Sequence, residues 1–558
     1  MSTILTPFLL WKDYDTPERS LNVRVVLSYI ENDLEYTELY FDGRCVDNKY
    51  VRVFAITAIP VGAKNLPVMV LIDGIERDID KEKITYWANN GYAAVGVDYC
   101  GGAGIKTVYP DSLDYCNYSQ SGRHYSHVDT TADETVWYNW AYCVRRAITY
   151  MLSLSCVNGK INLYSLREAS KIAMMVLGVD KRIRAGAVLF GSCWEQTEFK
   201  SFQAEELSDM ESAIDFRIKN EEEKERMLAG VSPQTYAALI EIPMLIVQGT
   251  NSTITDMTTV YDAVNRMKNN GNSTVLHIPR MMDTFDSKDR EMLKMWFENP
   301  EPPKLVNMSA TQREGKLILK ADLKELRGVS DVKIYYSRGI MSQSVRNWVL
   351  AKNGTFLFDE YEAEAEIVDL NMPITVICNL INMGRTLSSH PMTIIPSSIG
   401  VLETVERTKL IYKGKQGLAE FVPMNPSQPQ TLGFVLKNTL AEAVGAYDVS
   451  GVSGKNIATY CLNDPMYIFD AQSALTFDVY SAHTCDLTVY LATAWGTPNM
   501  TLFRTVHKLV GGQLWQKVST TMDDFKSVSG KFAKDNLSSL ILAFSAEQDI
   551  VLNNILFT

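Results

Sequence analysis

The residues best suited to chemistry lie just after predicted strands. Ser192, Cys193, Trp194 and Glu195 follow the apolar run 185–191, and α/β sheets place their ligands at such strand ends. A cysteine becomes a nucleophile when a base activates its thiol, yet the sequence shows no base near Cys193. We therefore expect Trp194 and Glu195 to line the wall of a pocket, with Cys193 as a candidate nucleophile or a structural thiol.

A second group of candidates lies in the polar loop 119–129. His124 and His127 stand three residues apart, with Asp129 close by, and imidazole and carboxylate groups of this kind bind metals or sugars. Two histidines and one carboxylate make only half of a metal signature. We favour a solvated loop, and we predict no metal and no cofactor. His277 lies inside an apolar strand and is predicted to be a core or edge residue.

These loops connect the elements of a mostly parallel sheet. Alternating residues open the chain, and five short apolar strands then alternate with helix-length segments such as 135–153 and 168–177. This rhythm predicts a doubly wound α/β sheet with helices on both faces. The five strands are expected at 67–73, 92–98, 161–164, 185–191 and 243–249.

The rest of the chain is predicted to be all β. Prolines at 300, 302 and 303 mark a linker, because proline blocks both helices and central strands. Short alternating strands with frequent turns follow, and a second break comes near Pro396. We predict an α/β domain over residues 1–299, a small fibronectin-like β-sandwich over 300–398 and a longer β-sandwich over 399–558.

The first segment resembles the α/β-hydrolase superfamily, in particular the acetylxylan-esterase and carbohydrate-esterase branch of multidomain bacterial hydrolases. The resemblance covers roughly residues 20–299. It rests on the order strand, sharp turn, helix over 160–177, and on four further segments. These are the turn from Asp98 to Gly102, the helix that begins at Trp137, the segment 181–187 and the turn Gly249-Thr250-Asn251.

The resemblance also assigns catalytic slots, and this chain fills each with the wrong residue type. The nucleophile slot of the Gly-x-Ser-x-Gly turn falls on Arg167, the acid slot on Ser252, the base slot on Asp283 and the oxyanion slot on Asp73. A guanidinium stays protonated and cannot attack a carbonyl, and a carboxylate would oppose an oxyanion. Asp256 could replace the acid only if its loop bends back.

Two structural expectations follow from these slots. Ser165 and Ala169 replace the glycines that flank the nucleophile in the family, so we expect the strained turn to have relaxed. Arg167 and Asp283 would face each other across the lost site, because the nucleophile and base slots are adjacent in the fold. We predict an ion pair between them that plugs the site.

The C-terminal segment resembles jelly-roll carbohydrate-binding modules. The segments 515–525 and 540–557 match the final strands of such modules. Sugar binding there would need exposed aromatic rings, for which Tyr460, Tyr490 and Trp495 are the candidates. Packing in the core is the alternative for all three.

Composition limits the partners. The formal net charge of −12 disfavours contact with phosphate backbones and anionic lipids, so we expect neither nucleic acid nor membrane as a partner. No apolar run is long enough to span a bilayer, and no secretory signal is visible. Nine scattered cysteines fit reduced thiols in a cytoplasmic protein; export without a leader stays open.

Three functions remain open, and the first is favoured. Because a catalytic triad works as a unit, loss at four slots predicts an inactive hydrolase-like protein that acts as a binding, scaffold or self-assembling protein. The second is an intracellular carbohydrate or acyl esterase with a non-standard catalytic set. The third is a glycan-binding protein that uses its C-terminal β domain. Homo-oligomers, protein assemblies and carbohydrate ligands are the partners that these functions imply.

Overall fold

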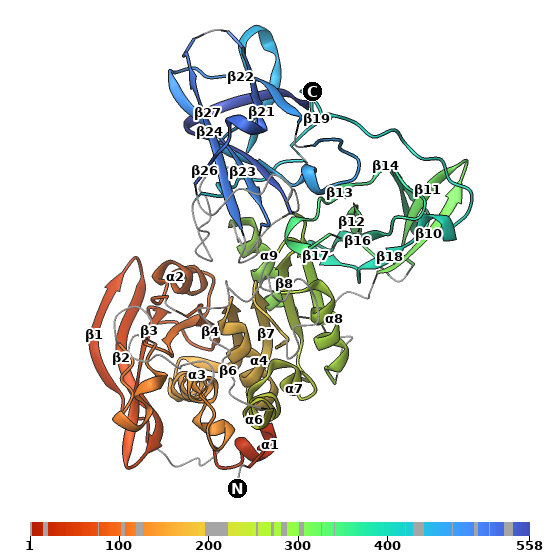
Figure 1. The fold of residues 1–558 in the computed structure, drawn as a ribbon. Coiled ribbons are helices and arrows are strands. Elements are labelled where there is room, and N and C mark those ends of the chain that lie inside the picture. The colour runs from red at the N-terminus through yellow and green to blue at the C-terminus, as the bar shows by residue number, and fades with distance from the viewer. Residues whose placement is uncertain are drawn as a thin grey trace.

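The computed structural model describes most of the chain. The described residues are 3–14, 20–75, 77–101, 106–118, 127–195, 221–252, 255–268, 273–280, 287–300, 306–324, 326–339, 341–418, 420–427, 440–470, 472–495, 500–512, 514–528 and 539–558. They form three units, each built around its own sheets (Figure 1). In this described part, no helix is long and apolar enough to cross a membrane.

A nine-stranded sheet forms the first unit. Its strands, in spatial order, are β1 (Arg24–Glu31), β2 (Leu34–Val46), β3 (Lys49–Pro60), β5 (Ala93–Asp98), β4 (Leu66–Ile72), β6 (Val157–Leu166), β7 (Ile183–Leu189), β8 (Met244–Gly249) and β9 (Ser273–Ile278). Strands β1, β2, β3 and β5 pair antiparallel, whereas every pair from β5 to β9 is parallel. The predicted doubly wound α/β sheet is therefore confirmed.

Helices cover both faces of this sheet because alternate side chains of each strand point to opposite faces. The described helices are α1 (Pro7–Leu10), α2 (Lys81–Asn89), α3 (Val136–Ser153), α4 (Ala169–Val179), α6 (Glu221–Val231), α7 (Pro233–Ala237), α8 (Met257–Arg266) and α9 (Ser287–Glu298). Val68 and Val70 of β4 share a core with α3, α4 and α8. Met69 and Leu71 share the opposite core with α2 and α9.

The second unit consists of two antiparallel sheets over a common core. One sheet contains β10 (Asn307–Arg313), β11 (Lys316–Asp322), β15 (Glu360–Ala365) and β14 (Lys352–Leu357). The other contains β13 (Val349–Leu350), β12 (Val329–Arg338), β16 (Ile374–Asn382), β17 (Arg385–Ser388) and β18 (Met392–Ile394). Leu319, Ala363, Ile334 and Val376 are among the buried side chains between them.

The third unit is antiparallel and is held together by its last strand. Its strands are β19 (Leu410–Tyr412), β20 (Ala441–Val444), β21 (Ser450–Thr459), β22 (Ala474–Tyr480), β23 (Cys485–Thr493), β24 (Thr501–Leu509), β25 (Gln516–Thr521), β26 (Lys526–Ser527) and β27 (Ile541–Phe557). The first half of β27 pairs with β23 and the second half with β22, while β21 pairs along its other edge. All of these strands thus belong to one hydrogen-bonded sheet, which surrounds an apolar core.

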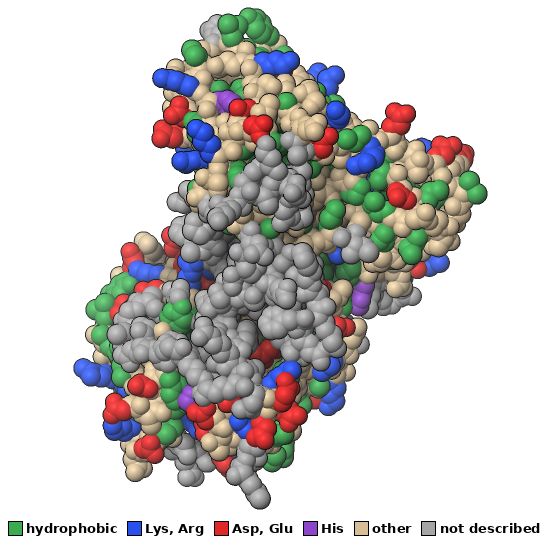
Figure 2. Space-filling model, viewed as in Figure 1, with side chains coloured by type: hydrophobic (Ala, Val, Ile, Leu, Met, Phe, Trp, Pro, Cys, Tyr) green, Lys and Arg blue, Asp and Glu red, His purple; other side chains and the backbone are tan. Residues whose placement is uncertain are grey.

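On the face seen in Figure 2, Lys and Arg side chains are interspersed with Asp and Glu side chains, and neither sign forms a continuous patch.

Candidate functional site

Arg167 occupies a strained elbow between β6 and α4. Its backbone N–H donates to the Leu189 carbonyl at 2.8 Å, which extends the pairing of β6 with β7 by one residue, and its own carbonyl accepts the Ser170 N–H at 2.8 Å. Between these bonds the φ angle of Arg167 is +54°, in the left-handed region that a residue with a Cβ rarely adopts. The strand-turn-helix order therefore did locate a sharp turn at the nucleophile slot.

The expectation that this elbow has relaxed is wrong. We based it on the loss of the two flanking glycines, but glycines on neighbouring strands provide the space instead. A Cβ on Gly191, after β7, would lie 2.0 Å from the Arg167 carbonyl oxygen. A Cβ on Gly74, after β4, would lie 2.5 Å from Oε2 of Glu168. The elbow fits because these two positions carry no side chain.

The oxyanion slot is occupied by the side chain of its own residue. The Gly74 N–H donates to Oδ1 of Asp73 at 2.8 Å, and the other carboxylate oxygen pairs with Lys83. This backbone donor beside the elbow is thus already bonded to a carboxylate. Burial raises the pKa of the adjacent Glu168, an effect that Arg167 opposes and Asp73 reinforces.

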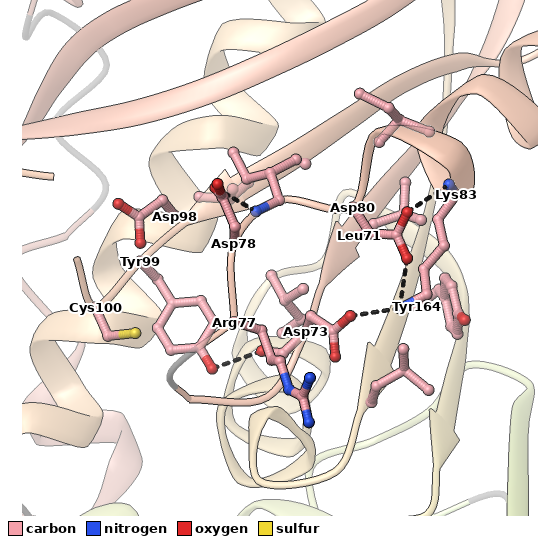
Figure 3. Close-up of a pocket in the computed structure, with 16 residues that line it drawn as sticks. Leu71, Asp73, Arg77, Asp78, Asp80, Lys83, Asp98, Tyr99, Cys100 and Tyr164 are labelled. Carbon is pink, nitrogen blue, oxygen red and sulfur yellow. Dashed lines mark hydrogen bonds and ion pairs between the residues drawn. The ribbon is translucent and has the colours of Figure 1, made fainter. Parts of the chain in front are cut away.

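A pocket opens beside this slot at the carboxyl ends of β4, β5 and β6 (Figure 3). It contains about 420 Å³ of empty space, part of which is open to solvent. Its charged side chains already have partners: Lys83 pairs with Asp73 and Asp80, and Lys106 pairs with Asp78. This pocket was not predicted from the sequence, although carboxylates at the ends of two apolar strands, Asp73 and Asp98, were the visible signal. The lining residues are Leu71, Ile72, Asp73, Arg77, Asp78, Ile79, Asp80, Lys83, Ile84, Gly96, Val97, Asp98, Tyr99, Cys100, Tyr164 and Leu166.

Ser252, the expected acid position, lies at the junction with the second unit. Ser252 is buried; its hydroxyl accepts the Thr255 N–H at 3.2 Å, and its carbonyl accepts Nε2 of Gln343 at 3.2 Å. Asp256 does not bend back toward the elbow. Its carboxylate accepts the Thr258 N–H at 2.7 Å and caps the N-terminus of α8.

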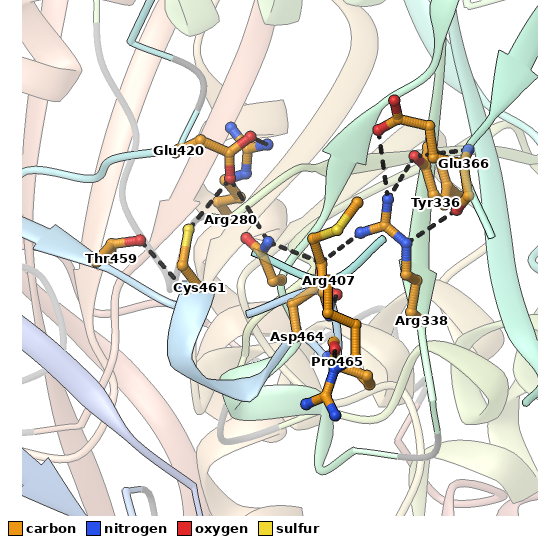
Figure 4. Close-up of polar contacts among 12 residues, drawn as sticks. Arg280, Tyr336, Arg338, Glu366, Arg407, Glu420, Thr459, Cys461, Asp464 and Pro465 are labelled. Carbon is orange, nitrogen blue, oxygen red and sulfur yellow. Dashed lines mark hydrogen bonds and ion pairs between the residues drawn. The ribbon is translucent and has the colours of Figure 1, made fainter. Parts of the chain in front are cut away.

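The chain that leads to the base slot is anchored in the third unit. Arg280, which follows β9 at a φ of +61°, donates its N–H to Oγ1 of Thr250 at 2.8 Å. Its guanidinium lies 3.8 Å from Oε1 of Glu420, whose other oxygen accepts the Cys461 thiol at 3.3 Å (Figure 4). Asp283 itself lies outside the described residues, so its ion pair with Arg167 stays a prediction.

The loop histidines do not form a described metal site. His124 lies outside the described residues, and the His127 ring packs against Tyr115 with centroids 4.0 Å apart. Within the described ranges, no three His, Cys, Asp or Glu side chains are grouped as metal ligands. His277 is fully buried, as expected for a core residue.

The residues after β7 are packed against other parts of the first unit. Cys193 is buried in the core, and burial raises the pKa of its thiol to about 12, which leaves almost no thiolate at neutral pH. Trp194 is partly buried under the Arg266 guanidinium, 4.5 Å from the ring centroid. Glu195 forms a buried ion pair with Lys171 at 2.7 Å. None of the three lines the pocket beside the elbow.

The proposed aromatic platform for sugars is wrong. Tyr460, Tyr490 and Trp495 are 1%, 7% and 6% exposed, so their rings cannot stack on a ligand from solvent. They share a cluster with Val345 of the second unit. The other members of the cluster come from the third unit itself, so the rings are core residues, as the alternative predicted.

Comparisons with known proteins give similarity in structure alone. Neither a protein family nor a curated protein matches the sequence. Similar solved structures include the acetyl xylan esterase from Paenibacillus sp. R4 (18% identity, TM-score 0.42, 53% of this chain and 96% of that chain). Acetyl xylan esterase 1 from Thermoanaerobacterium sp. JW/SL YS485 is 14% identical, with a TM-score of 0.43, and the match covers 54% of this chain and 96% of that chain. The glucuronoyl esterase from Solibacter usitatus is 11% identical, with a TM-score of 0.37, and the match covers 53% of this chain and 91% of that chain. In each case the similarity covers about half of this chain.

Proposed function

We propose that this chain is a non-catalytic protein with an α/β-hydrolase-like domain, and that it acts as a binding or scaffold protein. The observation that carries the proposal is Arg167 on the intact elbow. The fold still holds one residue in the strained conformation that presents a nucleophile, but that residue is a cation with no lone pair available for attack.

The surroundings of the elbow support the same proposal. The Gly74 N–H is bonded to Asp73, and Asp256 caps a helix. Ser252 lies in a buried junction. An acyl-transfer site needs a nucleophile, a base and an oxyanion donor that converge on one point. At this elbow the corresponding groups are replaced or bonded elsewhere.

Hydrolysis of short-chain aryl acetates by the purified full-length chain tests the proposal. We expect a rate equal to that of buffer for the wild type and for Arg167→Ala, because neither provides a nucleophile. Turnover that Cys193→Ala abolishes would overturn the proposal by identifying a thiol enzyme. Turnover that both variants retain would equally overturn it, because other residues would then do the chemistry.

A further inference from the structure

The two edges of the nine-stranded sheet differ in their protection. At one edge, β9 is covered by the second unit: the His277 N–H donates to Oγ of Ser388 at 2.8 Å, and the His277 carbonyl accepts Nδ2 of Asn379 at 2.8 Å. At the other edge lies β1, whose only strand neighbour in the described part of the chain is β2. The outer backbone groups of β1 can therefore pair with a further strand.

Strand β1 is unusually apolar for an exposed edge. Its sequence is Arg-Val-Val-Leu-Ser-Tyr-Ile-Glu, and Val25, Val26, Leu27 and Ile30 are 55%, 54%, 48% and 66% exposed. Figure 2 shows hydrophobic side chains gathered at the margin of the first unit where Figure 1 places β1. Natural proteins usually protect such edges with charges or cover, so four exposed apolar side chains on one edge strand indicate a partner.

The order of residues in β1 fits a second copy of the same strand. If two β1 strands pair antiparallel about a two-fold axis at Ser28, with the extra residue Val26 of each copy bulged out of the ladder, Arg24 of each copy faces Glu31 of the other. Val25 then faces Ile30, Leu27 faces Tyr29 and Ser28 faces its own copy, so uncharged residues meet one another. Opposite charges meet at both ends and no like charges oppose, which is what cross-strand pairing requires.

Contacts within the chain hold β1 in its own sheet. Tyr29 stacks on Tyr36 of β2 with centroids 5.3 Å apart, which holds the strand against its own sheet. Lys81 already pairs with Glu31 at 2.8 Å, so an arginine from a second copy would add another cation beside that carboxylate. The bulge at Val26 interrupts the pairing of β1 with β2.

We propose that β1 is a dimer interface, through which two copies of this chain join their sheets by antiparallel β1 pairing. A two-fold contact of this kind uses the same patch on both copies and closes on itself. The inference is independent of the loss of catalysis, because an active enzyme could dimerise in the same way.

Sedimentation equilibrium of the full-length chain over the micromolar range tests the proposal. We expect a dimer of the 62.8 kDa chain. In the double variant Val25→Lys/Ile30→Lys, lysines face each other across the axis, and we expect the dissociation constant to rise at least tenfold. The control Val506→Lys changes a side chain of similar exposure on β24 and should leave the dimer unchanged.

A charge exchange tests the register separately. Arg24→Glu should weaken the dimer because two carboxylates then meet at each end, and Arg24→Glu/Glu31→Arg should restore it. Circular dichroism establishes that each variant is folded. A monomeric wild type, or a dimer that the double lysine variant leaves intact, would overturn the proposal, and failure of the charge exchange to restore dimerisation would overturn this register.

Discussion

At the scale of single residues, sequence reasoning located Arg167 but not its conformation. The order of strand, turn and helix was sufficient to place the elbow, because it depends on neighbouring residues in the chain. The elbow, where φ is +54°, packs closely against Gly191, which follows another strand and whose added Cβ would lie 2.0 Å from the Arg167 carbonyl oxygen. The local sequence around Arg167, from which we expected the elbow to relax, contains no information on such long-range contacts.

His277 predicts how stability depends on pH. Burial, with a smaller contribution from His390, lowers the pKa of its imidazole to about 3 in the folded state, whereas an unfolded histidine titrates near 6.5. The unfolded state therefore binds a proton between these values that the folded state does not. Stability from this residue is complete above pH 6.5 and falls by about 1.4 kcal/mol per unit as the pH decreases toward 3.

Urea unfolding at several pH values checks this prediction in the wild type and in His277→Leu. We expect the variant to lose less stability between pH 6.5 and 4.5 than the wild type. At pH 8 the imidazole is neutral in both the folded and the unfolded state. The difference in the free energy of unfolding between the two proteins at that pH therefore measures the change in packing. Parallel pH profiles would show that His277 takes up a proton in the folded state.

At the scale of elements, the periodicity predicted the strands and helices of the first unit well. Predicted segments 135–153 and 168–177 correspond to α3 and α4, which their apolar faces place against the sheet. Segments whose burial depends on contact with another unit could not be predicted from local patterns. The loop after β8 is buried against Gln343 of the second unit, and the rings of Tyr460 and Trp495 pack in a third-unit cluster that Val345 of the second unit joins.

The close contact between Gly191 and the elbow should contribute to the free energy of unfolding. In Gly191→Ala the new methyl group would meet the Arg167 carbonyl at 2.0 Å and Oγ of Ser170 at 2.3 Å. The backbone must move to accommodate it, so we expect the free energy of unfolding to fall by about 3 kcal/mol. Thermal or urea denaturation measures this loss.

Gly62→Ala is the matched control. Gly62 has a φ of +71° and no atom within 4 Å of an added Cβ, so the substitution should cost only the backbone strain of about 1 kcal/mol. Equal losses in the two variants would show that the elbow does not require the contact at Gly191.

At the scale of the whole molecule, a buried polar network connects the three units. Arg338 of the second unit pairs with Asp464 of the third at 2.7 Å, and Nδ2 of Asn347 donates to the same carboxylate at 3.1 Å (Figure 4). Burial raises the pKa of Asp464, an effect that Arg338 opposes. Together with Arg280 and Glu420, which join the first unit to the third, these contacts favour one fixed arrangement of the units.

A double-mutant cycle measures the coupling across this junction. Arg338→Met leaves the Asp464 carboxylate buried without its cation, so we expect a loss of about 3–5 kcal/mol in the free energy of unfolding. Arg338→Met/Asp464→Leu removes both charges and should lose clearly less. Additive losses in the cycle would contradict a coupled pair.

If the elbow carries no activated nucleophile, the protein should not react with a fluorophosphonate, and this test requires no choice of substrate. Such a reagent labels serine nucleophiles that a base has activated. Intact-mass spectrometry of the full-length chain after exposure should show unmodified protein, with an active serine esterase as the positive control. A single stoichiometric adduct, mapped to a serine near the carboxyl ends of β6 and β7, would contradict the account.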